Sequence, residues 1–359
     1  MGELKSLEIC AGAGGQALGL EQAGFAHEAV VEIDTDACET LRRNRGSAWK
    51  VVEDDVANVD GRAFQHVDLI AGGVPCPPFS IAGKQLGHDD ERDLFPQALR
   101  LVAEARPRAV LLENVRGLAT RRFDGYRAQV LARLEGLGYQ TWWDLVQASD
   151  HGLPQLRPRF VLVAIRPPWA SWFRWPQRLP GRPPHVGEVL SDLMSSGGWP
   201  GAAAWAGQAS RIAPTIVGGS KKHGGPDLGP TRARAEWRML GVDGLGIAND
   251  VPGPDFPAGA IPRLTVRMVA RLQGFPDSWE FPGRKTAAYR QVGNAFPPPV
   301  ARAVGESIAA ALRQADPAPA LRLPGPAPAG EAQHHASLND HRPADVPTRT
   351  SDLAEHDGS

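Results

Sequence analysis

A single cysteine lies in a proline-rich segment that directly follows an apolar run. The segment reads "DLIAGGVPCPPFSIAGKQ" over residues 68–85 and holds Cys76 between prolines. Prolines stiffen the segment, and loops at the carboxyl ends of buried strands often carry functional groups. A thiolate is a good nucleophile only near positive charge or a partner base, and many cysteines are inert core residues. The local sequence therefore permits covalent chemistry at Cys76 without deciding it.

A glycine-rich turn follows the first apolar run of the chain. The run "SLEIC" leads into "AGAGG" and then into the helix-like "QALGLEQAGF". Glycines at such a turn let the backbone approach a ligand at the carboxyl edge of a parallel sheet. The turn lacks the G-x-G-x-x-G spacing that holds a pyrophosphate on a helix N-terminus, which argues against a dinucleotide.

Two carboxylates follow at the ends of the next predicted strands. Glu32 in "VVEID" is placed to accept hydrogen bonds from ribose hydroxyls, and Asp55 in "EDDV" is placed to accept one from an adenine amino group. Each carboxylate alone is better explained as an ordinary exposed loop residue. Together, at successive strand ends, they favour an adenosyl cofactor.

The elements that must hold these residues alternate between strands and helices. Strand-like runs are "SLEIC", "EAVVEID", "VDLIAGG", "RAVLLENV" and "RFVLVAI", with helix-like segments between them. This alternation predicts an α/β fold with a doubly wound, mostly parallel sheet. The pattern fades after about residue 166, where Pro, Gly and Trp become frequent, and helical patterning returns near residue 263.

These changes of pattern predict how the chain is divided into domains. Residues 1–166 form the first part of a catalytic and cofactor-binding domain, and residues 263–314 complete it. Residues 167–262 form a second, smaller and irregular domain. Residues 315–359 are rich in Pro, Ala, His and Asp and poor in large apolar residues, which predicts a disordered tail.

The composition is that of a globular protein from a reducing compartment. The 359 residues are 42% hydrophobic, enough for one large core and a smaller second lobe. Cys10, Cys38 and Cys76 are too widely spaced to suggest a disulfide framework or a pair of metal ligands, so no metal is expected. No apolar run approaches the roughly 20 residues of a membrane span, and we expect a cytoplasmic protein.

The charge is unevenly distributed along the chain. The formal net charge is −1, yet residues 151–240 carry 12 Lys and Arg against 4 Asp and Glu, with six of the ten tryptophans. Such a basic, aromatic region suits a polyanion-binding surface. On charge alone, a solvated loop region explains it equally well.

Several short segments, taken in their order along the chain, resemble the motifs of a known family. These are "EICAGAGGQALGLEQAGF", "VEIDTDA", "GGVPCPPFSIAGKQ", "LLENV", "LPQLRPR" and "AAYRQVGNAFPPPVA". In order and spacing they resemble the successive motifs of the cytosine-5 DNA methyltransferases, of the prokaryotic restriction-modification type. The resemblance covers about residues 5–166 and 263–313. It implies the Rossmann-like fold of S-adenosylmethionine-dependent methyltransferases with an inserted target-recognition domain.

The resemblance implies a catalytic role for five residues. The thiolate of Cys76 would add to the 6-position of cytosine and so make the 5-position nucleophilic. Glu113 would contact ring nitrogen 3 and, when protonated, offset the developing charge, which requires a raised pKa. Arg159 would contact the cytosine carbonyl oxygen, with Arg157 beside it. Their charge would favour the thiolate, and Asn114 would support the loop.

The methyl donor implied by the resemblance is S-adenosylmethionine. The residues that would line its pocket are Cys10, Ala13, Gly15, Glu32, Ile33, Asp55, Val56, Gly73, Pro75, Leu94, Asn294 and Ala295. Cys10 departs from the Phe that family members commonly place against the adenine, so we expect weaker stacking or compensation by Ile33. The "CPP" triplet in place of the frequent "CQ" is a second departure, in the loop next to the target base.

The basic region corresponds in position to the family's target-recognition domain. A base inside a duplex cannot present its ring face to Cys76, so the cytosine must be flipped out of the double-stranded DNA. Candidates for phosphate or guanine contacts are Lys221, Lys222, His223, Arg232 and Arg234. The charge pattern predicts salt-dependent DNA binding.

Three alternative functions agree less well with the residues of this chain. A tRNA cytosine-5 methyltransferase of the same fold would keep Cys76 and Glu113, but no segment resembles that subgroup's recognition sequence. A catalytically silent DNA-binding module would not favour keeping both residues together with Arg159. An NAD-dependent dehydrogenase lacks support because the pyrophosphate fingerprint is missing. Family analogy implies a monomeric enzyme of a restriction-modification system, with a restriction endonuclease acting on the same site.

Overall fold

The computed structural model describes residues 2–75, 93–219, 225–257 and 259–314 of the chain. The described residues belong to one compact unit. Cys76 lies outside the described residues, as do Lys221, Lys222 and His223. The predicted tail over residues 315–359 lies outside them as well.

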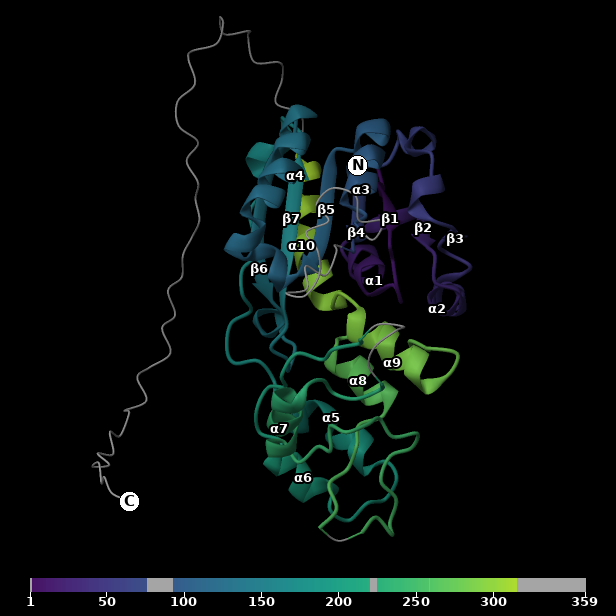
Figure 1. Cartoon of the computed structure of the whole chain (residues 1–359), viewed down its shortest axis with the longest axis vertical. Helices are drawn as coiled ribbons and strands as arrows, with labels where there is room; N and C mark the ends of the chain where they lie inside the picture. Colours follow the sequence, from purple (N-terminus) through teal and green to yellow (C-terminus); the bar gives the residue numbers. More distant parts are fainter. Residues whose placement is uncertain (1, 76–92, 220–224, 258, 315–359) are drawn as a thin grey trace, which may run out of the picture. The chain divides into compact units, whose positions relative to one another are not determined.

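A seven-stranded sheet forms the centre of the described unit, in the order β3-β2-β1-β4-β5-β7-β6 (Figure 1). Neighbours from β3 to β5 are parallel, whereas β7 is antiparallel to both β5 and β6. The doubly wound, mostly parallel sheet expected from the sequence is therefore confirmed. The strands are β1 (Leu4–Ile9), β2 (Phe25–Glu32), β3 (Val51–Glu53), β4 (Leu69–Gly73), β5 (Ala109–Val115), β6 (Gln140–Gln147) and β7 (Pro158–Ile165).

Helices cover both faces of the sheet because side chains alternate along each strand. On β5, Leu111 packs in the core cluster that contains α10 (Pro298–Leu312), and Leu112 packs in the cluster that contains α3 (Phe95–Ala105) and α4 (Asp124–Gly136). The glycine-rich turn leads into α1 (Gly15–Gln22), and α2 (Thr35–Arg45) follows β2. Short 3-10 turns span Val56–Asn58, Gly61–Phe64, Arg116–Ala119, Arg121–Phe123, Ala148–His151 and Trp169–Trp172.

Helices α1 and α10 approach each other closely through a glycine. A Cβ atom on Gly19 would lie 2.4 Å from the carbonyl oxygen of Pro298 and 2.6 Å from the Cβ of Ala301. Such distances leave no room for a side chain. The helix that follows the glycine-rich turn is thus packed directly on the last described helix of the chain.

The segment between β7 and residue 262 contains helices and irregular loops. Its helices are α5 (Val186–Ser195), α6 (Ala202–Gln208) and α7 (Thr231–Met239), and the chain continues into α8 (Val266–Leu272) and α9 (Lys285–Asn294). Trp205 of α6 and Trp237 of α7 are buried in one hydrophobic cluster together with Met268 of α8 and with Leu41 and Trp49 of the N-terminal part. The segment therefore shares its core with the helices around it.

Candidate active site

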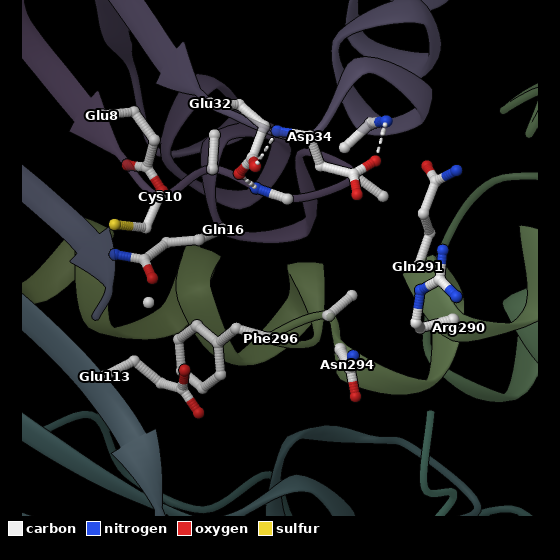
Figure 2. Close-up of a pocket in the computed structure, with 16 residues that line it drawn as sticks. Glu8, Cys10, Gln16, Glu32, Asp34, Glu113, Arg290, Gln291, Asn294 and Phe296 are labelled. Atoms are coloured by element: carbon white, nitrogen blue, oxygen red, sulfur yellow. Dashed lines mark hydrogen bonds between the residues drawn. The ribbon is translucent and has the colours of Figure 1, made fainter. Parts of the chain in front are cut away.

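A cavity of about 210 Å³ opens at the carboxyl ends of the parallel strands (Figure 2). In a doubly wound sheet this edge is the usual place for ligands. The lining residues come from β1, β2, β4 and β5, from the turns after β1 and β2, from the first turns of α1 and α2, and from α9 and the α9–α10 connection. They are Glu8, Cys10, Ala11, Gly12, Ala13, Gln16, Glu32, Asp34, Ala37, Gly73, Glu113, Arg290, Gln291, Asn294, Ala295 and Phe296.

The carboxylate of Glu32 is held in place at the end of β2 by three backbone N–H groups. Its Oε2 accepts from Gly12 at 2.7 Å, and its Oε1 accepts from Ile33 at 2.9 Å and from Asp34 at 2.8 Å. Gly12 has φ +53°, a conformation that suits glycine. A carboxylate offers about four lone-pair sites, so these contacts leave capacity for a ribose hydroxyl.

Six of the twelve predicted cofactor residues line this cavity. They are Cys10, Ala13, Glu32, Gly73, Asn294 and Ala295. The other six do not line it, and these are Gly15, Ile33, Asp55, Val56, Pro75 and Leu94. All twelve assignments stay predictions about an S-adenosylmethionine site.

Two of the residues outside the cavity wall have other contacts. A Cβ atom on Gly15 would lie 2.3 Å from the carbonyl oxygen of Phe296, so this glycine admits Phe296 to the cavity wall. The Oδ1 atom of Asp55 accepts from the Ala57 N–H at 2.9 Å and so caps a short turn after β3. Ile33 is 65% exposed, directly after Glu32.

Cys10 occupies the turn after β1 with an unusual backbone. Its φ of +51° lies in the left-handed region, which is uncommon for a residue with a side chain. Burial and the nearby carboxylates of Glu32 and Glu8 raise the pKa of the Cys10 thiol. The thiol therefore stays protonated at neutral pH, which makes Cys10 part of the cavity wall and a poor nucleophile.

Glu113 and Arg159 form a buried ion pair across neighbouring strands. The Arg159 Nε lies 2.9 Å from the Glu113 Oε1, and each side chain is 10% exposed. Burial raises the pKa of Glu113, while the positive charges of Arg159 and Arg157 partly offset the rise. Glu113 also lines the cavity, so the residue predicted to contact the cytosine ring is part of the wall of the predicted cofactor pocket.

Asn114 connects β5 with the segment that leads to Cys76. Its Nδ2 donates to the carbonyl oxygen of Val74 at 2.7 Å, and its Oδ1 accepts from the Val115 N–H at 2.8 Å. These contacts fix the last described residues before Cys76 relative to the strand that carries Glu113. The supporting role expected of Asn114 is consistent with this position.

Arg157 has contacts that differ from those expected of a residue beside the target base. It is fully buried, and it is not among the residues that line the cavity. Its guanidinium donates to the carbonyl oxygens of Ile216 at 2.5 Å, Gly293 at 2.7 Å and Ala295 at 2.8 Å. These contacts indicate a positioning residue, because guanidinium donors occupied by three carbonyls tie three segments of the chain together.

Two of the predicted DNA contacts lie on α7. The side chain of Arg232 is 93% exposed and forms an ion pair with Glu236 at 3.3 Å. The Nη2 of Arg234 donates to the Thr231 Oγ1 at 3.3 Å. An exposed arginine with a weak surface partner is free to contact a phosphate, since such pairs contribute little to stability.

Several cavity residues were not predicted from the sequence. These are Glu8, Ala11, Gly12, Gln16, Asp34, Ala37, Arg290, Gln291 and Phe296. A carboxylate inside the apolar run "SLEIC" was a usable signal for Glu8, because charged residues are rarely buried without a partner. Gln291, whose Oε1 accepts from the Thr40 Oγ1 at 2.6 Å, and Phe296 both lie within the motif "AAYRQVGNAFPPPVA".

The chain matches the family of C-5 cytosine-specific DNA methylases over residues 4–310. It belongs to this family. It is 55% identical over 347 residues to the Type II methyltransferase M.NaeI of Lentzea aerocolonigenes, covering 96% of this chain and 80% of that protein. It is 51% identical over 314 residues to the Type II methyltransferase M.NgoMIV of Neisseria gonorrhoeae, covering 87% of this chain and 99% of that protein.

A solved structure supports the fold independently. The Entamoeba histolytica methyltransferase EhMeth superposes with a TM-score of 0.62 at 14% sequence identity, covering 88% of this chain and 100% of that one. The family match and the two relatives confirm the resemblance derived from the motifs, and the protein is a DNA (cytosine-5) methyltransferase that acts on DNA.

Within the described segments, no helix is long and apolar enough to cross a membrane. The same segments hold no group of three or more His, Cys, Asp or Glu that could bind a metal ion.

Proposed function

We propose that this methyltransferase takes its methyl group from S-adenosylmethionine and modifies a cytosine flipped out of duplex DNA, with Cys76 as the nucleophile. One observation carries the proposal. Glu113, which is paired with Arg159, lines the same cavity as Glu32, so the residue for the base and the residue for the cofactor share one site.

The residues of the cavity suit an adenosyl sulfonium. Glu32 has acceptor capacity for the ribose, and the glycine-rich turn brings the backbone close to the cavity. When bound, S-adenosylmethionine would supply the methyl group, because its sulfonium sulfur leaves as a neutral thioether. Asn294 and Ala295 line the cavity from the C-terminal motif and support this use of the site.

The reaction follows from the chemistry of cytosine. The Cys76 thiolate forms a bond to carbon 6, and the electron pair of the 5,6 double bond becomes available at carbon 5. Glu113, whose pKa is raised by burial, donates in its protonated form a proton to ring nitrogen 3 as charge develops there. Arg159 donates to the carbonyl oxygen of the base. After methylation, loss of the carbon 5 proton and departure of the thiolate restore the aromatic ring.

We further propose that the enzyme protects DNA within a restriction-modification system. The two relatives of highest identity reported above are both named Type II methyltransferases. The methylated site would then coincide with the site of a restriction endonuclease. DNA recovered from cells that express the protein should resist that endonuclease, whereas DNA from cells expressing Cys76→Ser should not.

The test of the reaction uses the purified chain and its Cys76→Ser variant. Each is incubated with radiolabelled S-adenosylmethionine and either GC-rich duplex DNA or tRNA, and the methylated base is identified after hydrolysis. We expect 5-methylcytosine in DNA with the wild type alone. Label in tRNA would instead support the RNA methyltransferase, and DNA binding without any label on genomic DNA would support a silent module.

A further inference from the structure

A backbone hydrogen bond joins the residues on either side of the segment that carries Cys76. Pro75 is the last described residue before the cysteine, and the Leu94 N–H donates to its carbonyl oxygen at 3.2 Å. This carbonyl belongs to the planar peptide unit that links Pro75 to Cys76. The position of Leu94 therefore helps to set where the backbone of Cys76 begins.

Among the described residues, two groups donate to the carboxylate of Asp93, which directly precedes Leu94. The hydroxyl oxygen of Tyr126, in the first turn of α4, lies 2.7 Å from both Oδ1 and Oδ2, so its single proton is shared between them. The Phe95 N–H donates to Oδ1 at 3.1 Å. The backbone contact supports the start of α3 and does not need a tyrosine, so the contact with Tyr126 serves a further purpose.

The ring of Tyr126 is held by packing that does not involve the Cys76 segment. It lies edge-on against Phe95, with ring centroids 5.8 Å apart and an interplanar angle of 89°. Phe95 is buried in the hydrophobic cluster on the α3 and α4 face of the sheet, and Tyr126 packs partly buried against that cluster. The hydroxyl group is thus directed at Asp93 from a fixed support.

The chain is therefore held on both sides of Cys76. On the side before the cysteine, the Asn114 Nδ2 of β5 donates to the carbonyl oxygen of Val74. On the side after it, Tyr126 of α4 donates to Asp93. Asn114 belongs to the motif "LLENV", whereas Tyr126 lies in none of the motifs that carry the family resemblance. The contact from α4 is visible only in the folded structure.

We infer that Tyr126 is a positioning residue for the Cys76 nucleophile and acts through Asp93. The inference rests on the proposed role of Cys76. The connection runs from the hydroxyl of Tyr126 to the carboxylate of Asp93, and from the adjoining Leu94 N–H to the carbonyl of Pro75. Displacing a reacting group by about 1 Å can slow a reaction by about 100-fold. Loss of the hydroxyl should therefore slow attack of the thiolate on carbon 6.

Binding of the substrates should not depend on this contact. Tyr126, Asp93 and Leu94 are not among the residues that line the cavity formed by the described chain. Tyr126 thus differs from Glu32 and Glu113, because its effect is expected in the rate of the chemical step rather than in affinity.

The test uses the full chain and the variant Tyr126→Phe, which removes the hydroxyl and keeps the ring against Phe95. Single-turnover methylation of genomic duplex DNA is measured at saturating S-adenosylmethionine and DNA, and calorimetry and filter binding give the two affinities. Tyr139→Phe is the matched control. Its hydroxyl donates to the carbonyl oxygen of Pro107 at 2.7 Å, before the start of β5 and at the end of the sheet opposite to the cavity.

We expect Tyr126→Phe to lower the single-turnover rate by about tenfold or more, with both affinities unchanged. Tyr139→Phe should keep the wild-type rate, although it loses a buried hydrogen bond and some melting temperature. A loss of rate that merely reflected lower stability would appear in both variants.

A double-mutant cycle tests whether Tyr126 acts through Asp93. Asp93→Ala should slow the reaction at least as much as Tyr126→Phe, and the double variant should be no slower than Asp93→Ala, because both changes remove the same contact. Asp93→Asn keeps an acceptor oxygen for the hydroxyl and should retain most of the rate.

Three results would overturn the inference. They are a wild-type rate for Tyr126→Phe, effects of Tyr126→Phe and Asp93→Ala that add in the double variant, and a loss of affinity without a loss of rate. A wild type that transfers no methyl group, or a Cys76→Ser variant that still turns over, would refute the proposed function and the inference with it. The two kinds of failure are therefore distinguishable.

Discussion

Two opposing effects act on the pKa of the Glu113 carboxyl group, which is buried and forms an ion pair with Arg159. The arginine 2.9 Å away favours the carboxylate, whereas burial favours the neutral acid, and the net result is a raised pKa for Glu113. A group balanced in this way can change its protonation state when a base ring enters the site. The pair is thus suited to proton donation at the moment charge develops on cytosine.

We predict that Glu113→Gln lowers turnover by about 100-fold or more, because the amide cannot donate the proton to ring nitrogen 3. In the wild type, turnover should fall as pH rises through the raised pKa of Glu113, since the required neutral acid is lost. Single-turnover rates of both proteins over a pH series check both points. Wild-type turnover of the variant would exclude Glu113 as the acid.

The burial of Glu8 in β1 affects the pH dependence of the protein's stability. Because the folded pKa of Glu8 is raised, the folded state binds more protons than the unfolded state above pH 4.5, and stability falls as pH rises from there. Glu8→Gln removes this loss. We predict that the ligand-free variant gains melting temperature over the wild type at pH 8 but little at pH 4.5, as measured by calorimetry. A gain of equal size at both pH values would contradict this assignment.

At the scale of elements, Arg157 joins the start of β7 to the chain at Ile216 and to the end of α9. A lysine could not satisfy all three carbonyl acceptors, because it lacks the planar fork of donors. We predict that Arg157→Lys lowers the free energy of unfolding by about 1–3 kcal/mol, whereas Arg159→Lys mainly lowers turnover. Urea unfolding and activity assays on both variants separate the two roles. Equal stability of the two variants would argue against the positioning role.

The contact between α1 and α10 gives a second prediction for elements. A methyl group on Gly19 would collide with the backbone of Pro298, so Gly19→Ala should destabilise the protein by about 1–3 kcal/mol. Gly125→Ala in α4 is the control, because a Cβ atom there meets nothing within 4 Å. The control should be neutral or up to about 1 kcal/mol more stable, since alanine favours helices. Thermal unfolding of both variants measures the difference.

The sequence predicted the elements best where the physical signal is local. Apolar runs located the buried strands. Glu32 was expected at a strand end, Gly73 and Glu113 were expected from the family resemblance, and the structure brings the three residues to one cavity. Strand β6 was not predicted, because it forms the edge of the sheet and its side chains are half exposed. An edge strand of this kind has no continuous apolar run.

The contacts of single residues were less predictable. Arg157 and Arg159 are two positions apart in "LPQLRPR", and nothing local indicates that one binds backbone carbonyls and the other a carboxylate. That difference depends on Ile216 and Ala295, which are distant in sequence. That Glu8 has no hydrogen-bond partner among the described residues likewise becomes visible only in the folded structure.

At the scale of the whole molecule, the charge distribution predicts how DNA binding responds to salt. Residues 151–240 carry 12 basic against 4 acidic residues, while the complete chain has a net charge of −1. Basic residues that neutralise phosphates release counterions, so affinity for DNA should fall by about tenfold or more between roughly 50 and 200 mM salt. Filter binding at several salt concentrations measures the slope. Binding of S-adenosylmethionine is the internal control, and it should change far less.

The hydrophobic cluster that includes Trp205, Trp237, Met268, Leu41 and Trp49 has a consequence for protein engineering. A chimera that exchanges only residues 167–262 with another methyltransferase would cut through this cluster and leave mismatched surfaces on α2 and α8. Exchange of sequence specificity between relatives should therefore succeed more often when the α8 and α9 segments are transplanted together with the recognition region. The segment that can be exchanged between relatives is therefore defined by the side chains that pack together, and it is longer than the inserted region itself.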